Sequence, residues 1–269
     1  MFKKLANLER RYIFIIVALC IIVPFILGKI LPVSISSPVQ SAYDAIEHLP
    51  AGSRILISID YEPASEPELQ PILYAILRHA FRKDLKIIMM CQWALGFPLG
   101  QGALFEVAKE YNKQYGTDFV NIGYRPGISA VMLGIGREIR DFFACDCAGV
   151  PIDSLPLMQS VHNYRDIALL IGLEAGATGD FWVQIANAQF GEKIILGGTA
   201  VMAPDLYPYL QSGQIEGLIG GLKGAAEYET LVESYGRGIK GMTAQSVAHL
   251  AIIFFIILGN IGYFVTRKK

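Results

Sequence analysis

Two long apolar segments lie at the two ends of this chain, and they constrain its architecture more than any other feature. They cover 12–32 and 247–266, and Lys29 is the only Lys, Arg, Asp or Glu in either segment. Each is close to the roughly 20 apolar residues that cross the hydrocarbon core of a bilayer as a helix. We therefore expect two transmembrane helices with one domain between them, on one side of the membrane.

The basic residues beside each segment predict which side that is, because Lys and Arg are retained on the cytoplasmic side. The outer flanks of the two segments carry more of them than the flanks that face the middle of the chain. We expect residues 1–11 and 267–269 to be cytoplasmic, with the central domain outside a cell membrane. A cleaved signal peptide is the alternative, but the first segment is long and no small-residue cleavage pattern follows it. The outer flanks hold Lys3, Lys4, Arg10, Arg11, Arg267, Lys268 and Lys269; the inner flanks hold Lys29, Arg237 and Lys240.

Composition excludes some partners. The formal net charge is −1, and Lys and Arg are scattered along the chain rather than gathered in stripes. A nucleic-acid binder needs a basic face to neutralise phosphates, so we expect no nucleic-acid partner. The four cysteines are Cys20, Cys91, Cys145 and Cys147, and Cys20 lies in the first apolar segment. Three cysteines in the outside domain are too few for a disulfide framework, and the redox state of Cys145 and Cys147 is left open.

The middle of the chain alternates between short apolar runs and amphipathic stretches. Near-continuous apolar strands separated by helices are typical of a parallel sheet covered on both faces. The sequence predicts an α/β domain over 54–235, with a doubly wound, mostly parallel, Rossmann-like sheet of about six strands. We expect a linker and a lead-in helix over 33–53 and a second linker over 236–246. The strands are predicted at 54–60, 86–91, 118–122, 166–173, 193–198 and 215–220, and the main helices at 41–48, 67–82, 102–115, 127–140, 155–161, 180–190, 205–210 and 222–233.

One stretch resembles a known family. Residues 196–229, LGGTAVMAPDLYPYLQSGQIEGLIGGLKGAAEYE, are similar to periplasmic ligand-binding proteins in their order of strand, helix and short strand. The resemblance implies an α/β fold, and it raises the possibility of a ligand-binding receptor. Those proteins generally use two lobes, whereas this chain predicts one domain.

Polar side chains follow several of the predicted strands. In open parallel sheets, ligands bind outside the carboxyl ends of the strands. The candidate ligand-binding residues are therefore Asp60, Glu62, Arg125, Glu174 and Thr199. Loop capping and solvation is the plainer interpretation of the acids. Several carboxylates could also hold Ca²⁺ or Mg²⁺, but their spacing matches no known metal loop, and we expect neither a metal nor a cofactor.

Other patterns are weaker. The segment from Gly123 to Gly127 precedes a predicted helix, and its backbone amides with Arg125 could hold a carboxylate or phosphate. A tight turn is the simpler interpretation of the glycines. Cys145 and Cys147 could bind a metal with outside ligands, pair with another chain, or attack a substrate with His162 as base, although two free thiols are the simpler interpretation. The sequence holds no G-x-S-x-G, H-E-x-x-H or C-x-x-C motif.

The second apolar segment carries two polar residues, His249 and Asn260, eleven positions apart. At about 100° per residue they fall on one helix face, and Gly259 and Gly262 near Asn260 permit close helix contact. Polar groups at membrane depth usually face protein. We expect this face to contact the first span or the same helix of another copy.

These patterns identify no reaction. The leading hypothesis is a non-enzymatic, membrane-anchored component of an assembly, whose outside domain binds a partner or another copy of itself. The lipid bilayer and another membrane protein, or self-association, are the expected partners. The alternative is an envelope hydrolase or transferase, or a small-ligand receptor, with its site at the carboxyl ends of the strands. Ligand, partner and copy number are left open.

Overall fold

The computed structural model of the 269-residue chain describes residues 9–27 and 31–267. It divides into two compact units, one of residues 33–238 and one that contains the two ends of the chain. Lys3, Lys4, Lys29, Lys268 and Lys269, which entered the topology argument, lie outside the described residues.

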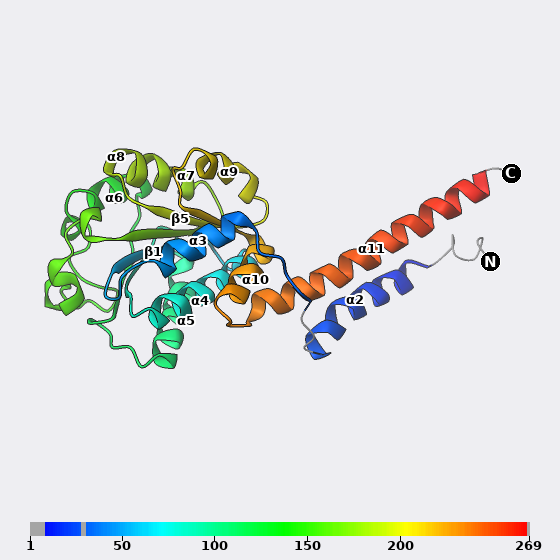
Figure 1. Ribbon diagram of the computed structural model, residues 1–269, viewed down its shortest axis with the longest axis horizontal. Coiled ribbons are helices and arrows are strands. Elements are labelled where there is room, and N and C mark those ends of the chain that lie inside the picture. The colour runs from blue at the N-terminus through cyan, green and yellow to red at the C-terminus, as the bar shows by residue number, and fades with distance from the viewer. Residues whose placement is uncertain (1–8, 28–30, 268–269) are drawn as a thin grey trace. The chain divides into compact units, whose positions relative to one another are not determined.

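Residues 33–238 form an α/β domain around one six-stranded sheet in which every pairing is parallel (Figure 1). The strand order is β3-β2-β1-β4-β5-β6, the order of doubly wound Rossmann folds. The chain lays down β1, β2 and β3 outward to one side and then returns to β4 beside β1, so the order reverses between β1 and β4. The strands are β1 Arg54–Asp60, β2 Lys86–Cys91, β3 Phe119–Tyr124, β4 Leu169–Glu174, β5 Ile194–Gly198 and β6 Gly217–Gly220.

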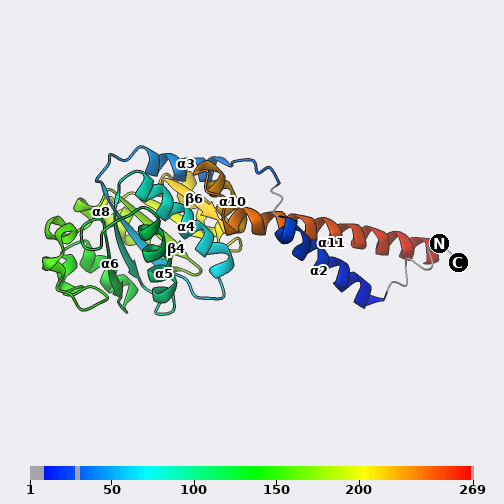
Figure 2. The ribbon, with the colours of Figure 1, turned by 90° about the horizontal axis from the view of Figure 1, so that it is seen from below.

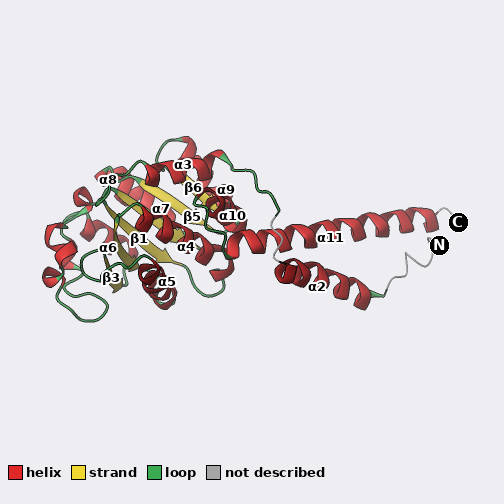
Figure 3. Cartoon of the chain, turned by 60° about the horizontal axis from the view of Figure 1, so that its bottom comes forward, coloured by secondary structure: helices red, strands yellow, loops and turns green. Residues whose placement is uncertain are grey.

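Helices cover both faces of this sheet (Figures 1 and 3). Strand residues alternate between two buried apolar clusters, one on each face. One face packs against α3 Ser37–Glu47, α4 Glu66–Arg82, α5 Gly96–Glu110 and α10 Gly221–Leu231. The other packs against α6 Ile128–Ile135, the 3₁₀ turns η1 Ile139–Asp141, η2 Ile152–Ser154, η3 Pro156–Ser160 and η4 Tyr164–Asp166, the helical stretch α7 Thr178–Trp182, η5 Val183–Asn187 (a π-helix) and α8 Ala188–Phe190, and α9 Ala203–Gln211.

The prediction of about six strands in an α/β sheet is confirmed, but several helix limits differ from those expected. Helix α5 begins at Gly96 rather than at residue 102. Its glycines permit close packing: a Cβ on Gly96 would lie 2.6 Å from the Ile59 carbonyl oxygen, and one on Gly100 would lie 2.8 Å from the Ile59 side chain. The helix ends at Glu110 rather than at residue 115, and Asn112 just beyond it takes the left-handed conformation (φ 53°). Close packing at the start and an asparagine cap at the end therefore account for the differences between the predicted and the observed limits of α5.

Two expected linkers are partly helical. Helix α3 begins at Ser37, where Pro38 occupies the first turn, instead of at residue 41. The second linker, 236–246, is helical from Arg237 onward. Its start is fixed by Glu229, whose carboxylate accepts hydrogen bonds from the amides of Gly236 (3.0 Å) and Gly238 (2.9 Å). A carboxylate from another helix thus supplies the N-terminal cap that the local sequence lacks.

The two ends of the chain form two apolar helices, α2 Arg10–Leu27 and α11 Arg237–Arg267 (Figure 2). By length and composition each could cross a membrane. The described helix α2 ends before residue 32, the expected end of the first span, while α11 includes the whole of the expected second span.

Candidate functional site

Two acidic residues lie side by side at the point where the strand order reverses. Asp60 is the last residue of β1 and Glu174 the last of β4, and their Cα atoms are register partners. Residues directly opposite each other on paired strands point to the same face of the sheet. Both side chains are completely buried, with 0% of their surface exposed. The sequence predicted both residues as candidates, and the fold brings them together.

Three residues hold Asp60 in place. Its carboxylate accepts hydrogen bonds from Ser58 Oγ (2.8 Å), from the backbone amide of Gln92 (2.9 Å) and from Trp182 Nε1 (3.1 Å). Trp182 reaches it by lying over Gly172, where a Cβ would come within 3.2 Å of the indole. Burial raises the pKa of Asp60 to about 6, although the bonds from Trp182, Gln92 and Ser58 lower it. These donors favour the ionised carboxylate.

Glu174 is in a different state. Neither carboxyl oxygen has a hydrogen bond of good geometry in the described part of the chain. The group packs directly on Gly179, where a Cβ would lie only 1.7 Å from Oε1, so no larger residue fits there without a shift. Burial, and then the charges of Asp60 and Asp180, raise the pKa of Glu174 well above its usual range, although the backbone amide of Gly179 lowers it. These causes favour the protonated form of Glu174, beside the hydrogen-bonded Asp60 carboxylate.

A bridge between two loops covers the acid pair. Trp93, which follows β2, donates a hydrogen bond from Nε1 to Thr178 Oγ1 (3.0 Å), which follows β4. Its ring also packs on Gly176, where a Cβ would lie 2.9 Å away. Because β1 lies between β2 and β4, this Trp93–Thr178 bridge passes over the end of β1. Beneath it, both polar atoms of the buried Gln92 amide lack a partner among the described residues.

Sequence reasoning missed most of this surrounding structure. In the sequence, Ser58 lies in a mostly apolar run and Trp182 in a predicted helix, so both would be interpreted as ordinary core residues. The available signal was the run after β4, Ala175 to Asp180 (AGATGD), in which two glycines allow side chains from other loops to approach the backbone. The two tryptophans of the chain both belong to this site, which makes their fluorescence a local probe.

The other predicted residues lie around this centre but not in it. Glu62 is partly exposed in the turn after β1. Arg125 is exposed at the end of the edge strand β3, with its guanidinium 5.4 Å from the Phe143 ring centroid. Strand β2 separates β3 from β1, which puts Arg125 about 10 Å across the sheet from Asp60. Asp60 and Arg125 therefore do not lie at the ends of neighbouring strands. Thr199 lies at the end of β5, where its carbonyl accepts the first amides of α9.

The segment of Cys145 and Cys147 is organised by the aspartate between them. Asp146 accepts hydrogen bonds from the amides of Ala148 and Val150 (both 2.8 Å) and from the hydroxyl of Tyr115 (2.6 Å). His162, the proposed base, instead contacts Glu138 and Arg140. These contacts explain the segment as a stabilised turn.

The four residues of α11 that were predicted to mediate helix association differ in their surroundings. On α11, His249 and Asn260 are exposed, and Asn260 Nδ2 donates to the Ile256 carbonyl of its own helix (2.9 Å). Gly259 has no neighbour within 4 Å of its Cβ position, whereas Gly262 is buried. An apolar groove of about 450 Å³ between α2 and α11 is lined on α11 by Thr243 and Val247. His249 and Asn260 lie about 140–160° around the helix from Val247, so the polar stripe faces away from the first apolar helix.

In the described residues, no three His, Cys, Asp or Glu side chains are grouped so that they could hold a metal ion. The chain matches no protein-family model, no curated protein and no solved structure. Function must therefore be argued from the site itself.

Proposed function

We propose that this protein is a membrane-anchored α/β domain that binds a small hydrogen-bonding ligand at the carboxyl ends of β1, β2 and β4. The observation that carries the proposal is the buried pair of Asp60 and Glu174, with unpaired polar atoms on Glu174 and on Gln92. Leaving a buried polar group without a partner costs about 1–3 kcal/mol. Two such groups at the switch point of a doubly wound sheet occupy the position where these folds bind ligands.

The chemistry of the pair indicates the kind of ligand. A neutral Glu174 can donate one hydrogen bond, while the Asp60 carboxylate and the Gln92 amide can accept others. A second anion here would be repelled by Asp60. A neutral or cationic ligand with hydroxyl or amine groups fits this arrangement best. The same separation of two carboxyl groups into an acid and a carboxylate is how acid–base catalysts are arranged, so the enzyme alternative shares this site.

The Trp93–Thr178 bridge supports a site that opens to admit its ligand. In this arrangement the bridge closes over bound ligand and excludes water, which strengthens every hydrogen bond beneath it. Trp93 lies in the loop after β2, and Thr178 begins the short helix α7 after β4, so both lie outside the strands and can move without disturbing them.

We also propose that the two apolar helices anchor the domain outside a cell membrane and that α11 associates with another copy of itself. The supporting observation is that the stripe of His249 and Asn260 lies on the opposite side of α11 from the residues that line its groove with α2. An amide exposed to hydrocarbon is stabilised by a partner helix.

Equilibrium dialysis against a small-molecule extract, followed by mass spectrometry of what the protein retains, tests the ligand proposal. We expect the wild type and Glu62→Met, a matched change on a nearby partly exposed carboxylate, to retain the same compound. Glu174→Met should lose it at least tenfold, because a thioether of similar size cannot donate the hydrogen bond that the neutral carboxyl supplies. Equal retention by all three proteins, or none by the wild type, would refute a ligand site at the acid pair.

A further inference from the structure

A polar pocket lies at the other end of the strands from the acid pair, near the amino ends of β4 and β5. Its volume is about 330 Å³, and its walls come from the end of α6, from η4 and from the end of α8. A pocket of this size is at the lower end of the range for small-molecule sites. The polar and aromatic side chains that line it are Arg137, Asn163, Tyr164, Arg165, Gln189 and Phe190.

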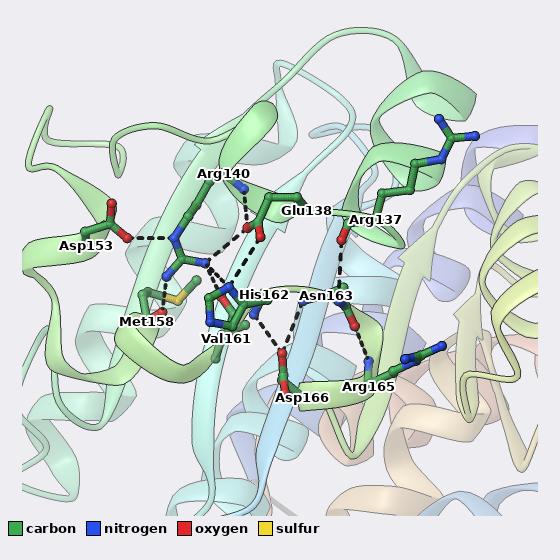
Figure 4. A network of polar contacts seen from close by, with 10 residues as sticks. All are labelled: Arg137, Glu138, Arg140, Asp153, Met158, Val161, His162, Asn163, Arg165 and Asp166. Carbon is green, nitrogen blue, oxygen red and sulfur yellow. Dashed lines mark hydrogen bonds and ion pairs between the residues drawn. The ribbon is translucent and has the colours of Figure 1, made fainter.

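The two arginines of this pocket have no acidic partner in the described part of the chain. Figure 4 shows the guanidinium groups of Arg137 and Arg165 pointing away from the polar network beside them. Both residues are exposed and line the pocket, and neither side chain has a hydrogen bond or an ion pair with any described residue. Their guanidinium groups lie apart in Figure 4, and an oxyanion bound at the pocket would supply acceptors for both.

The acids of the adjoining polar network, Glu138 and Asp166, bond to other residues. Arg140, by contrast with Arg137 and Arg165, is saturated (Figure 4). Glu138 contacts Arg140 and His162, and Asp166 accepts hydrogen bonds from the His162 and Asn163 amides. The remaining partners of Arg140 are Asp153 and the carbonyl oxygens of Met158 and Val161.

One side chain fixes the spacing of the two arginines. Asn163 donates from Nδ2 to the carbonyl oxygen of Arg137 (3.4 Å) and accepts at Oδ1 from the amide of Arg165 (3.1 Å). The backbones of Arg137 and Arg165 are thereby held together although they are far apart in sequence. A binding site held in position before its ligand arrives loses less entropy on binding.

The aromatic wall of the pocket is equally fixed. The Phe190 ring packs on Gly136, where a Cβ would lie 2.3 Å from the ring. Its centroid is 5.4 Å from that of Tyr164, whose hydroxyl donates to the Met132 carbonyl (2.8 Å). The pocket therefore has an aromatic wall held by packing and two exposed cationic side chains.

We propose that this pocket binds the phosphate group of a small molecule or of a lipid headgroup. Two guanidinium forks match the charge and geometry of a phosphate dianion, each by a bidentate contact. The Asn163 and Gln189 amides and the aromatic wall then contact the remainder of the ligand. This site is independent of the acid pair, which disfavours anions and lies at the other end of the strands.

Calorimetric titration of the full-length protein in detergent, at constant ionic strength, tests the proposal with inorganic phosphate and with glycerol 3-phosphate as probes. We expect saturable binding that weakens at least tenfold in Arg137→Gln and in Arg165→Gln and disappears in the double variant. Lys109→Gln, which removes an exposed charge on α5, is the matched control and should bind like the wild type. Arg165→Lys, which keeps the charge but loses the fork, should give intermediate binding.

A second arm distinguishes a soluble ligand from a lipid. The same proteins are compared in nanodiscs with and without phosphatidic acid. Arginine-dependent binding of the soluble probes supports a soluble ligand, and arginine-dependent binding of phosphatidic acid alone supports a headgroup. No saturable binding in either arm, or binding that both arginine variants retain with unchanged tryptophan fluorescence, would overturn the proposal.

Discussion

If the Trp93–Thr178 bridge opens locally, a substitution that removes its hydrogen bond should increase the population of the open state. Thr178→Val keeps the shape of the side chain and removes only the Oγ1 atom that accepts the Trp93 hydrogen bond. Thr178 is buried with 2% exposed, so Val should fill the same space. A single hydrogen bond contributes about 0.5–1.5 kcal/mol, which corresponds to a roughly 2- to 13-fold larger population of the open state, taking RT as about 0.59 kcal/mol.

Hydrogen exchange measures that population at the backbone amides beneath the bridge. The Gln92 amide donates to Asp60 Oδ1 (2.9 Å) and the Ala175 amide to the Asp60 carbonyl (3.1 Å). Both should exchange about 2- to 13-fold faster in Thr178→Val if exchange proceeds through local opening, while amides of β5 and β6 stay unchanged. The control is Thr230→Val, which removes a hydroxyl bonded to its own helix α10 and should leave Gln92 unaffected. Unchanged exchange at Gln92 in Thr178→Val, or an equal increase in every strand, would refute a bridge that gates the site.

Three further predictions concern the acid pair and the membrane helices. Because the folded-state pKa of Glu174 is raised, the stability that its protonation contributes is present at low pH and is lost as pH rises. Glu174→Gln should therefore match the wild type at pH 4 and be more stable by about 1–3 kcal/mol at pH 8. A difference in unfolding free energy between the two proteins, measured in urea, that stays constant from pH 4 to pH 8 would contradict the burial argument. Because burial raises the pKa of Asp60 to about 6, the free energy of unfolding of both proteins should also fall by about 2 kcal/mol between pH 4 and pH 6. Asn260→Leu should shift the detergent-solubilised protein toward smaller species in analytical ultracentrifugation, whereas Phe255→Leu should not; identical distributions would show that the polar stripe is merely tolerated. A topology reporter inserted at Gly213 should report the exterior and one fused to the C-terminus the cytoplasm, and an interior signal at Gly213 would reverse the orientation argument.

The strands were predictable because their residues act locally. A mostly apolar run such as Arg54–Asp60 is buried whichever neighbours it has, so the sequence alone predicts a buried strand there. The start of helix α5 was not predictable in this way, because Gly96 and Gly100 pack against Ile59, and a contact 37 residues or more away in sequence leaves no local sign.

The candidate site, too, was predictable only where local sequence was sufficient. Asp60 and Glu174 were found from the rule that ligands bind at strand ends, which needs only the strand limits. Their adjacency, and the distance of Arg125 from them, depend on the strand order, which a single sequence does not contain. The roles of Ser58 and Trp182 depend on the three-dimensional packing over Gly172.

The protonation of Glu174 at neutral pH is the central claim of this account, and difference infrared spectroscopy measures it directly. The spectrum of the wild type minus that of Glu174→Gln at pH 7 should contain the carbonyl band of a protonated, non-hydrogen-bonded carboxylic acid. That band should disappear from the wild type as pH is raised, and the Asp60 carboxylate bands should persist in both proteins. A difference spectrum with only carboxylate bands at pH 7 would mean that Glu174 is ionised, and the acid pair would then not be the divided donor and acceptor that the ligand proposal requires.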